Sequence, residues 1–131
     1  MNTLHLHKRL TVLVAEDDDT NYFFIYSILS RANVELKRAV NGREAIEICK
    51  QHPEIGLVFM DIKMPEVDGI EATIAIKAMR PEVVIIAQTA YVMQEDKEIA
   101  LKAGCDGILP KPIKKADMLA YIDKYVEEHV L

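Results

Sequence analysis

The sequence predicts an α/β fold in which helices cover both faces of a five-stranded parallel sheet. Short apolar runs alternate along the 131 residues with stretches of helical periodicity. Most of these runs are continuously apolar, as expected for parallel strands that are buried on both faces. Prolines or a glycine follow several helical stretches, where helices end. Five such strand–helix units give right-handed crossovers and a doubly wound sheet.

Five runs are the predicted strands. The runs at 12–15, 57–60 and 83–87 are continuously apolar and predict three interior strands. The run at 34–40 alternates apolar and polar residues, which suits a strand near the edge of the sheet. Ile108 and Leu109 form a short fifth run.

Apolar residues at helical spacing predict one helix after each strand, since an amphipathic helix turns its apolar stripe to the core. In chain order they are Ile25, Ile28, Leu29 and Ala32, then Ala45, Ile48 and Cys49, then Ile70, Ile74 and Ala78, then Ile99 and Ala103, and last Met118, Leu119, Ile122 and Val126. Pro53 and Pro81 follow the second and third helices, and Gly104 follows the fourth, where a left-handed residue is needed.

The length and composition predict a single domain at 10–129 preceded by a flexible tail at 1–9. The net charge of −5 argues against a partner with a phosphate backbone, so no nucleic acid is expected. No apolar run approaches about 20 residues and no signal core opens the chain, which predicts no membrane contact and a cytoplasmic location. Cys49 and Cys105 are isolated and suit buried thiols in a reducing compartment.

Four consecutive carboxylates, Glu16 to Asp19, follow the first strand. Two carboxylates about 4 Å apart repel each other by roughly 1 kcal/mol in water and about 4 kcal/mol at an effective dielectric constant near 20. The acids are either solvated, favouring the start of the next helix, or they bind a cation. This stretch alone leaves both interpretations open.

The ends of the other strands favour the cation. In an open parallel sheet, ligands bind beyond the carboxyl ends of the strands, where Asp61, Thr89 and Lys111 follow strands three, four and five. Hard oxygen ligands suit Mg²⁺. If Glu16 and Asp17 hold the metal, Asp61 keeps an oxygen free to attack phosphorus. The Lys111 ammonium and the Thr89 hydroxyl would then stabilise the charge on the transferred phosphoryl group.

Four motifs resemble those of response-regulator receiver domains, the phospho-accepting modules of two-component signalling. They are VLVAEDDD at 12–19, MDIKMPEVDG at 60–69, QTA at 88–90 and KPI at 111–113. The resemblance extends from about residue 10 to residue 128. It implies a flavodoxin-like strand order of 2-1-3-4-5. It also implies that Asp61 takes a phosphoryl group from a phosphohistidine, with a histidine kinase or a histidine phosphotransfer domain as partner.

The resemblance also assigns roles within the site. Asp17 is expected to be a direct Mg²⁺ ligand, Glu16 to act through water, and the backbone carbonyl of Lys63 to be a further ligand. The Lys111–Pro112 peptide bond is expected to be cis, which is inexpensive before proline. Among the remaining acids, Asp19 fits the N-cap of a helix that contains residues 22–31. The acidic run is therefore predicted to divide between metal binding and helix capping.

The same resemblance predicts how a signal would leave the domain. Phosphorylation is expected to shift a two-state equilibrium, with the fourth helix, fifth strand and fifth helix as output face and as the surface of a homodimer. The sequence departs from the family at Ile108, where an aromatic switch residue is usual. Tyr91 either shares that coupling or is an ordinary loop aromatic. Lys63 and Tyr91 occupy positions that tune the lifetime of the aspartyl phosphate.

The VLVAED opening and the AGCDGILPKPI ending look most like receivers attached to hybrid histidine kinases. The chain is expected to be either a stand-alone receiver or one cut from a larger protein. In the full-length protein it could be tethered to a membrane kinase. Because an ionised aspartate needs no base and no separate substrate is turned over, we expect a self-phosphorylating and self-dephosphorylating switch rather than an enzyme.

Rival functions fit fewer residues. Asp17, Asp19, Thr89 and Lys111 echo the motifs of haloacid-dehalogenase-type phosphatases, but that interpretation leaves Asp61 without a role. A receiver-like interaction module that is never phosphorylated is a second alternative. A calcium-binding EF-hand loop is excluded because Tyr22 and Ile28 stand where it needs glycine and glutamate.

Overall fold

The computed structural model describes residues 9–90 and 93–130 of the chain. Strands and helices alternate along it: β1 (Leu10–Ala15), α1 (Asp19–Leu29), β2 (Val34–Ala39), α2 (Gly42–Gln51), β3 (Ile55–Asp61), α3 (Gly69–Met79), β4 (Val84–Thr89), α4 (Gln94–Ala103), β5 (Gly107–Pro110) and α5 (Lys115–His129). All strand pairs are parallel and their order is β2-β1-β3-β4-β5. The predicted fold class and strand order are confirmed, and β2 is an edge strand as its alternating pattern indicated.

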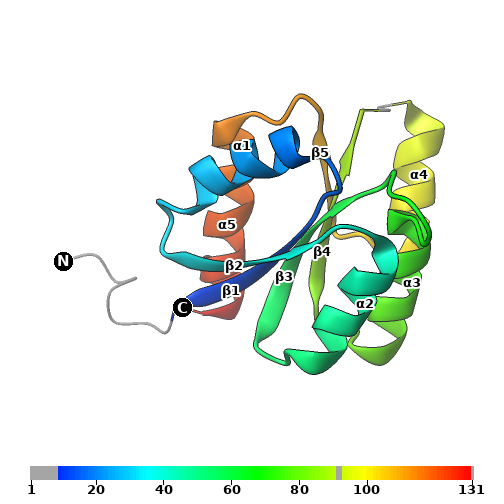
Figure 1. Cartoon of the computed structure of the whole chain (residues 1–131), viewed down its shortest axis with the longest axis horizontal. Helices are drawn as coiled ribbons and strands as arrows, with labels where there is room; N and C mark the ends of the chain where they lie inside the picture. Colours follow the sequence, from blue (N-terminus) through cyan, green and yellow to red (C-terminus); the bar gives the residue numbers. More distant parts are fainter. Residues whose placement is uncertain (1–8, 91–92, 131) are drawn as a thin grey trace.

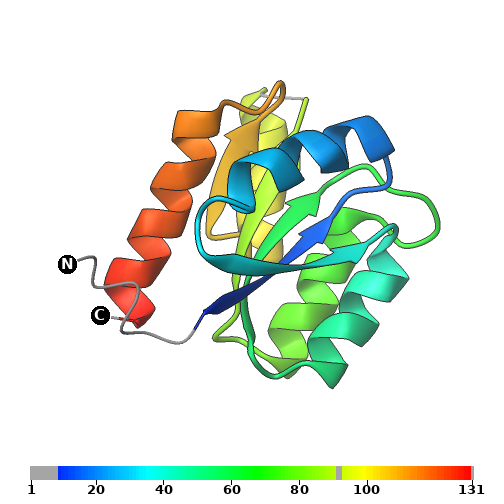
Figure 2. The same cartoon turned by 60° about the vertical axis from the view of Figure 1, so that its left-hand side comes forward.

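The sheet divides the core into two layers, with α1 and α5 on one face and α2, α3 and α4 on the other (Figure 1). The view in Figure 2 shows the twist of the sheet between these helix layers. Alternate residues of each interior strand enter the two layers. In β3, Val58 and Met60 pack on the α2–α4 side, while Leu57 and Phe59 pack on the α1–α5 side. This two-sided burial explains why the interior strands are continuously apolar.

A side chain of α5 occupies backbone groups of β5, the strand at the other edge of the sheet. The hydroxyl of Tyr121 accepts a hydrogen bond from the Ile108 backbone N–H at 3.2 Å and donates one to the Ile108 carbonyl at 3.0 Å. Pro110, at the end of the strand, has no N–H to offer. An edge strand with its polar backbone groups occupied resists pairing with another chain.

Side-chain caps start three of the helices and correct one prediction. Asp18, Asn41 and Asp68 accept hydrogen bonds from the backbone of residues 21, 44 and 71, at the first turns of α1, α2 and α3. The prediction that Asp19 caps the first helix is wrong, because that helix begins at Asp19 itself and the cap is Asp18, one residue earlier. Asp19 instead forms an ion pair with Arg38 at 2.8 Å.

The predicted apolar stripes hold for α1, α2 and α5 but not for α3 and α4. Ile74 and Ile99 are each 54% exposed. The buried residues of α3 are Gly69, Ala72, Thr73 and Ile76, and the only buried residue of α4 is Ala100. Each of these two helices therefore buries a different side from the predicted one. Apolar residues are adjacent in both sequences, at 74–76 and at 99–101, so more than one helical stripe fits them.

The helix ends agree with the sequence. The second and third helices end at Gln51 and Met79, shortly before their prolines. Gly104 follows α4 with a φ of 116°, in the left-handed region. Cys49 and Cys105 are buried free thiols. Among the helices that the structure describes, none combines the length and the apolar character needed to span a membrane.

Candidate functional site

The predicted site residues meet at one edge of the sheet because the strands are parallel and end together. Glu16 and Asp17 follow β1, Asp61 and Thr89 are the last residues of β3 and β4, and Lys111 follows β5. They line one cleft of about 290 Å³. Its other lining residues are Asp18, Asn21, Ile62, Lys63 and Ala90. Every site residue that the sequence predicted therefore borders the same cleft.

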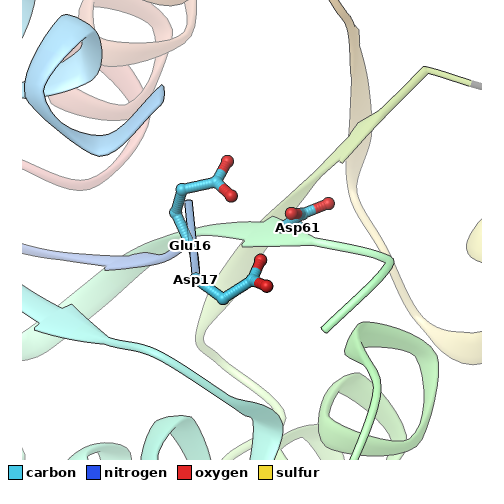
Figure 3. A group of neighbouring side chains, drawn as sticks. All are labelled: Glu16, Asp17 and Asp61. Carbon is cyan, nitrogen blue, oxygen red and sulfur yellow. The ribbon is translucent and has the colours of Figure 1, made fainter. Parts of the chain in front are cut away.

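Three carboxylates converge in this cleft. Glu16, Asp17 and Asp61 each offer an oxygen that lies within 4.8 Å of the others, and Figure 3 shows the three side chains around a common space. Glu16 and Asp61 are buried, with exposed fractions of 0% and 5%, whereas Asp17 is exposed. The burial makes their mutual repulsion stronger than it would be in water.

Backbone N–H groups orient two of these carboxylates. The N–H of Asp18 donates to Glu16 Oε2 and that of Lys63 donates to Asp61 Oδ1, both at 3.2 Å. Each donor lies two residues beyond its acceptor, so the turn that ends the strand also fixes the side chain. The backbone that turns away at the end of each strand therefore also orients the carboxylate there.

The cluster of acids is short of positive charge. Burial raises the pKa of Glu16 from 4.5 to about 7, and a hydrogen bond and the charge of Asp61 act in the same direction. Lys111 and the Asp18 N–H only partly offset this. A buried carboxyl group whose pKa lies this high indicates that the folded state favours additional positive charge at the site.

Lys111 places its ammonium beside two of the acids. Its Nζ lies 3.2 Å from Glu16 Oε1 and 3.2 Å from Asp61 Oδ2. Burial lowers the pKa of Lys111, but the charges of Asp61 and Glu16 outweigh that effect and the net shift is upward. Its backbone N–H donates to the Thr89 carbonyl at 2.9 Å, which ties the ends of β4 and β5 together. The Lys111–Pro112 bond is cis, as expected.

The donor set fits a hard divalent cation. Carboxylate oxygens from two strands lie close enough to share an ion, and Lys63, whose carbonyl is the further expected ligand, borders the same cleft. Mg²⁺ is commonly held through one or two carboxylates while it keeps several waters. The three acids are therefore a candidate Mg²⁺ site.

Sequence reasoning missed two polar residues beside the site. Arg38 of β2 contacts the acidic loop through its guanidinium. Gln88 of β4 is fully buried and pairs in register with Asp61, and its side-chain amide finds no hydrogen-bond partner among the described residues. Arg38 carried no local signal, because it meets the acidic loop only through the pairing of β2 with β1. Gln88 stands in the QTA motif at 88–90, but the motif alone assigns its side chain no role.

Ile108 is the position where the sequence departs from the family pattern. Ile108 is partly buried against the core on the α2–α4 side, and its backbone is held by Tyr121. Tyr91, the other residue considered for the coupling, lies outside the described residues, as do residues 1–8 of the predicted tail at 1–9.

A family model described as the response regulator receiver domain matches residues 12–123. The chain belongs to this family. The receiver match covers all five strands and extends into α5. The resemblance of the sequence motifs is thus confirmed.

Curated relatives include both small and large proteins. The chain is 32% identical over 120 residues to the polar-differentiation response regulator DivK of Brucella anthropi, covering 88% of this chain and 95% of DivK. It is 33% identical over 130 residues to hybrid signal transduction histidine kinase I of Dictyostelium discoideum, covering 90% of this chain but only 8% of the kinase. Receivers of hybrid kinases are thus among its relatives.

Two solved structures are similar in fold and sequence. The receiver domain of the sensor histidine kinase PA1611 from Pseudomonas aeruginosa, with a magnesium ion coordinated in its active-site cleft, superposes with a TM-score of 0.84 at 28% identity, covering 92% of this chain and 99% of that one. The Saccharomyces cerevisiae receiver domain of Ssk1, co-crystallised with the histidine phosphotransfer protein Ypd1, gives a TM-score of 0.80 at 32% identity, covering 92% and 89%.

These similarities show that the chain is a phospho-accepting signalling switch. Its relatives act in phosphorelay systems, and the phosphatase alternative is not favoured. Receiver domains are switches rather than enzymes that turn over a separate substrate.

Proposed function

We propose that Asp61 is the phospho-acceptor of a receiver domain formed by residues 10–129. One observation carries the proposal: a buried aspartate ends β3 with Lys111 3.2 Å from its carboxylate and two further acids close enough to share a cation with it. A lone acid at a strand end would be ordinary. An acid supplied with a fixed lysine and candidate metal ligands suits phosphoryl transfer.

In this reaction Asp61 is the nucleophile. An oxygen of its carboxylate attacks the phosphorus of a phosphohistidine, the P–O bond forms as the P–N bond breaks, and the imidazole leaves. No base is needed, because the attacking carboxylate is already ionised. Lys111 places its ammonium beside the reacting oxygen, and the Thr89 hydroxyl borders the same cleft as a donor to the phosphoryl oxygens.

Glu16, Asp17 and Asp61, with the carbonyl of Lys63, would hold Mg²⁺. When bound, the ion supplies positive charge that neutralises the phosphoryl oxygens. The excess of carboxylates in the cleft supports this assignment, and so does the magnesium in the cleft of the PA1611 receiver. The aspartyl phosphate then hydrolyses in the same site, which makes the domain self-dephosphorylating.

The partner we propose is a histidine kinase or a histidine phosphotransfer domain. Asn21 of α1 borders the cleft, and the same helix exposes Phe23, Phe24 and Tyr26. A partner histidine that reaches Asp61 would therefore meet exposed aromatic rings beside it. The output and a homodimer would use α4, β5 and α5, and the domain would work in the cytoplasm, alone or tethered to a membrane kinase.

The test is phosphorylation by acetyl phosphate with Mg²⁺, followed by intact mass. The wild type should gain one phosphoryl group and Asp61→Asn should gain none. Asp19→Asn is the matched control, since it also removes one carboxylate of the region but lies outside the cleft lining, and at saturating Mg²⁺ it should be phosphorylated like the wild type. An adduct that persists in Asp61→Asn would disprove the assignment. A wild type that never gains an adduct would favour the unphosphorylated interaction module.

A further inference from the structure

Arg38 contacts the acidic loop between β1 and α1 from outside the cleft. It comes from β2, the edge strand next to β1, and its side chain is 22% exposed. Its Nε donates to the Glu16 carbonyl at 3.1 Å and its terminal guanidinium nitrogen binds Asp19 Oδ1 at 2.8 Å. The guanidinium carbon lies 4.4 Å from the centre of the Tyr22 ring, at cation–π distance.

These contacts join both ends of the loop to one strand. Glu16 is the first residue after β1, whereas Asp19 and Tyr22 belong to the first turn of α1. The backbone adds a fourth tie, because the Glu16 N–H donates to the carbonyl of Ala39 at 2.9 Å. The two candidate ligands, Glu16 and Asp17, thus lie in a short segment that is fixed on either side.

The loop needs such a hold because its carboxylates repel one another. Arg38 pairs with Asp19, which does not line the cleft, and Arg38 does not line it either. The charge of Arg38 therefore offsets the repulsion among the acids of the loop from outside the cleft, so the space for a cation inside the cleft stays open. Glu16 and Asp17 keep their side chains available to the cleft.

We propose that Arg38 is a positioning residue that holds Glu16 and Asp17 in the cation-binding arrangement before the ion arrives. This inference rests on the proposed function, since it presumes that the cleft takes Mg²⁺. The planar guanidinium is essential to it, because one group must reach a carbonyl, a carboxylate and an aromatic face together. A lysine would keep the charge but not the three contacts.

The experiment is a Mg²⁺ titration of the full chain, followed by calorimetry and by amide NMR shifts. Arg38→Lys keeps the charge without the fork, and Arg38→Met keeps the apolar stem without the charge. Both should weaken Mg²⁺ binding by about 10-fold, the lower end of the range for residues that orient metal ligands. Asp19→Asn keeps an oxygen that can accept from Arg38 and removes one charge, so it should weaken binding by a smaller factor. Arg38→Gln, which keeps a polar donor, serves if one of the other Arg38 variants does not fold.

Electrostatics alone gives a different pattern. If Arg38 acted only as a nearby positive charge, Arg38→Met would bind Mg²⁺ more tightly and Arg38→Lys would bind as the wild type does. Either of those results would overturn the proposal. Arg80→Lys is the matched control. Arg80 also bonds several backbone carbonyls, but it lies near the amino ends of the strands, away from the cleft. The Mg²⁺ affinity of this variant should equal that of the wild type.

Failure of this inference can be told apart from failure of the proposed function. A wild type that binds no Mg²⁺ would refute the metal site itself. A wild type that binds Mg²⁺, with both Arg38 variants and Asp19→Asn binding equally well, would refute only the role of Arg38.

Discussion

Charged side chains are arranged differently at the two ends of the strands. We call the amino ends of the strands the amino edge of the sheet and their carboxyl ends the carboxyl edge. At the amino edge, Arg80 donates to the carbonyls of Cys49, His52, Pro53 and Ile55 at 2.8 to 3.3 Å. Asp106, before β5, binds the Lys77 ammonium at 2.8 Å and the Ile85 N–H at 2.9 Å. At the carboxyl edge, the Lys111 ammonium lies 3.2 Å from an oxygen of Glu16 and from one of Asp61, and Asp17 adds a third carboxylate close to both.

The difference separates stability from function. At the amino edge, Arg80 and Asp106 have several partners within the fold, so they should stabilise it. At the carboxyl edge, the burial and mutual repulsion of the acids should destabilise the metal-free protein. Substitutions should therefore have opposite signs at the two edges, which the following predictions test in order of expected size.

The largest effect is expected at the amino edge. Arg80→Ala should lower the free energy of unfolding by about 3 kcal/mol, because several charge-assisted hydrogen bonds to partly buried carbonyls are lost together. Urea denaturation would measure it. Arg43→Ala is the control: this exposed arginine lies 3.9 Å from Glu66 and should change stability by no more than about 0.5 kcal/mol. Equal losses in the two variants would contradict the comparison.

The next effect is a pH dependence that arises at the carboxyl edge. The pKa of Glu16 is about 7 in the folded protein and 4.5 as its ordinary value, so between these pH values the folded state retains a proton that the unfolded chain has released. Stability then falls as the pH rises. We expect the metal-free protein to lose about 2 kcal/mol between pH 4.5 and pH 7 from this group, measured by urea denaturation in a chelator.

Glu16→Gln is the matched variant for that experiment. It removes the titrating group while it keeps a similar shape, so its stability should be greater than that of the wild type at pH 7 and the decline between pH 4.5 and pH 7 should be much shallower. It should also bind Mg²⁺ more weakly. A variant with the same decline as the wild type would show that another group causes it.

The sequence allowed the carboxyl edge to be predicted far better than the amino edge. Each site residue lies directly at or after a strand, and parallel strands necessarily bring such residues together. The family resemblance then supplied the strand order. Asp61 and Lys111 are 50 residues apart, yet their meeting was predictable from topology alone.

The arginines were not predictable in this way. Arg38 and Arg80 act across 19 to 31 residues of chain, on carbonyls and a carboxylate that no motif marks. The sequence predicted the N-cap at Asp19, one residue too late, because four adjacent acids offer equivalent side chains. Only the path of the backbone determines which of them caps the helix. Ile74 and Ile99 were expected inside but are exposed, because adjacent apolar residues at 74–76 and 99–101 fit more than one helical stripe.

The smallest effect uses the helix caps to isolate the excess charge. Asp18 and Asp68 both cap helices by accepting from the backbone N–H three residues on, at 2.9 Å. Asparagine caps about as well as aspartate, so Asp→Asn keeps each cap and removes one charge. Asp68→Asn should lose a small favourable interaction with the helix dipole. Asp18→Asn loses the same interaction but relieves repulsion from Glu16 and Asp17, so metal-free Asp18→Asn should be the more stable of the two variants by about 0.5 kcal/mol.

Saturating Mg²⁺ should erase that difference, because the bound cation attracts Asp18 as well. If Asp18→Asn were the less stable variant without metal, the acids of the first loop would not be under mutual repulsion, and the contrast between the two edges would fail at its origin.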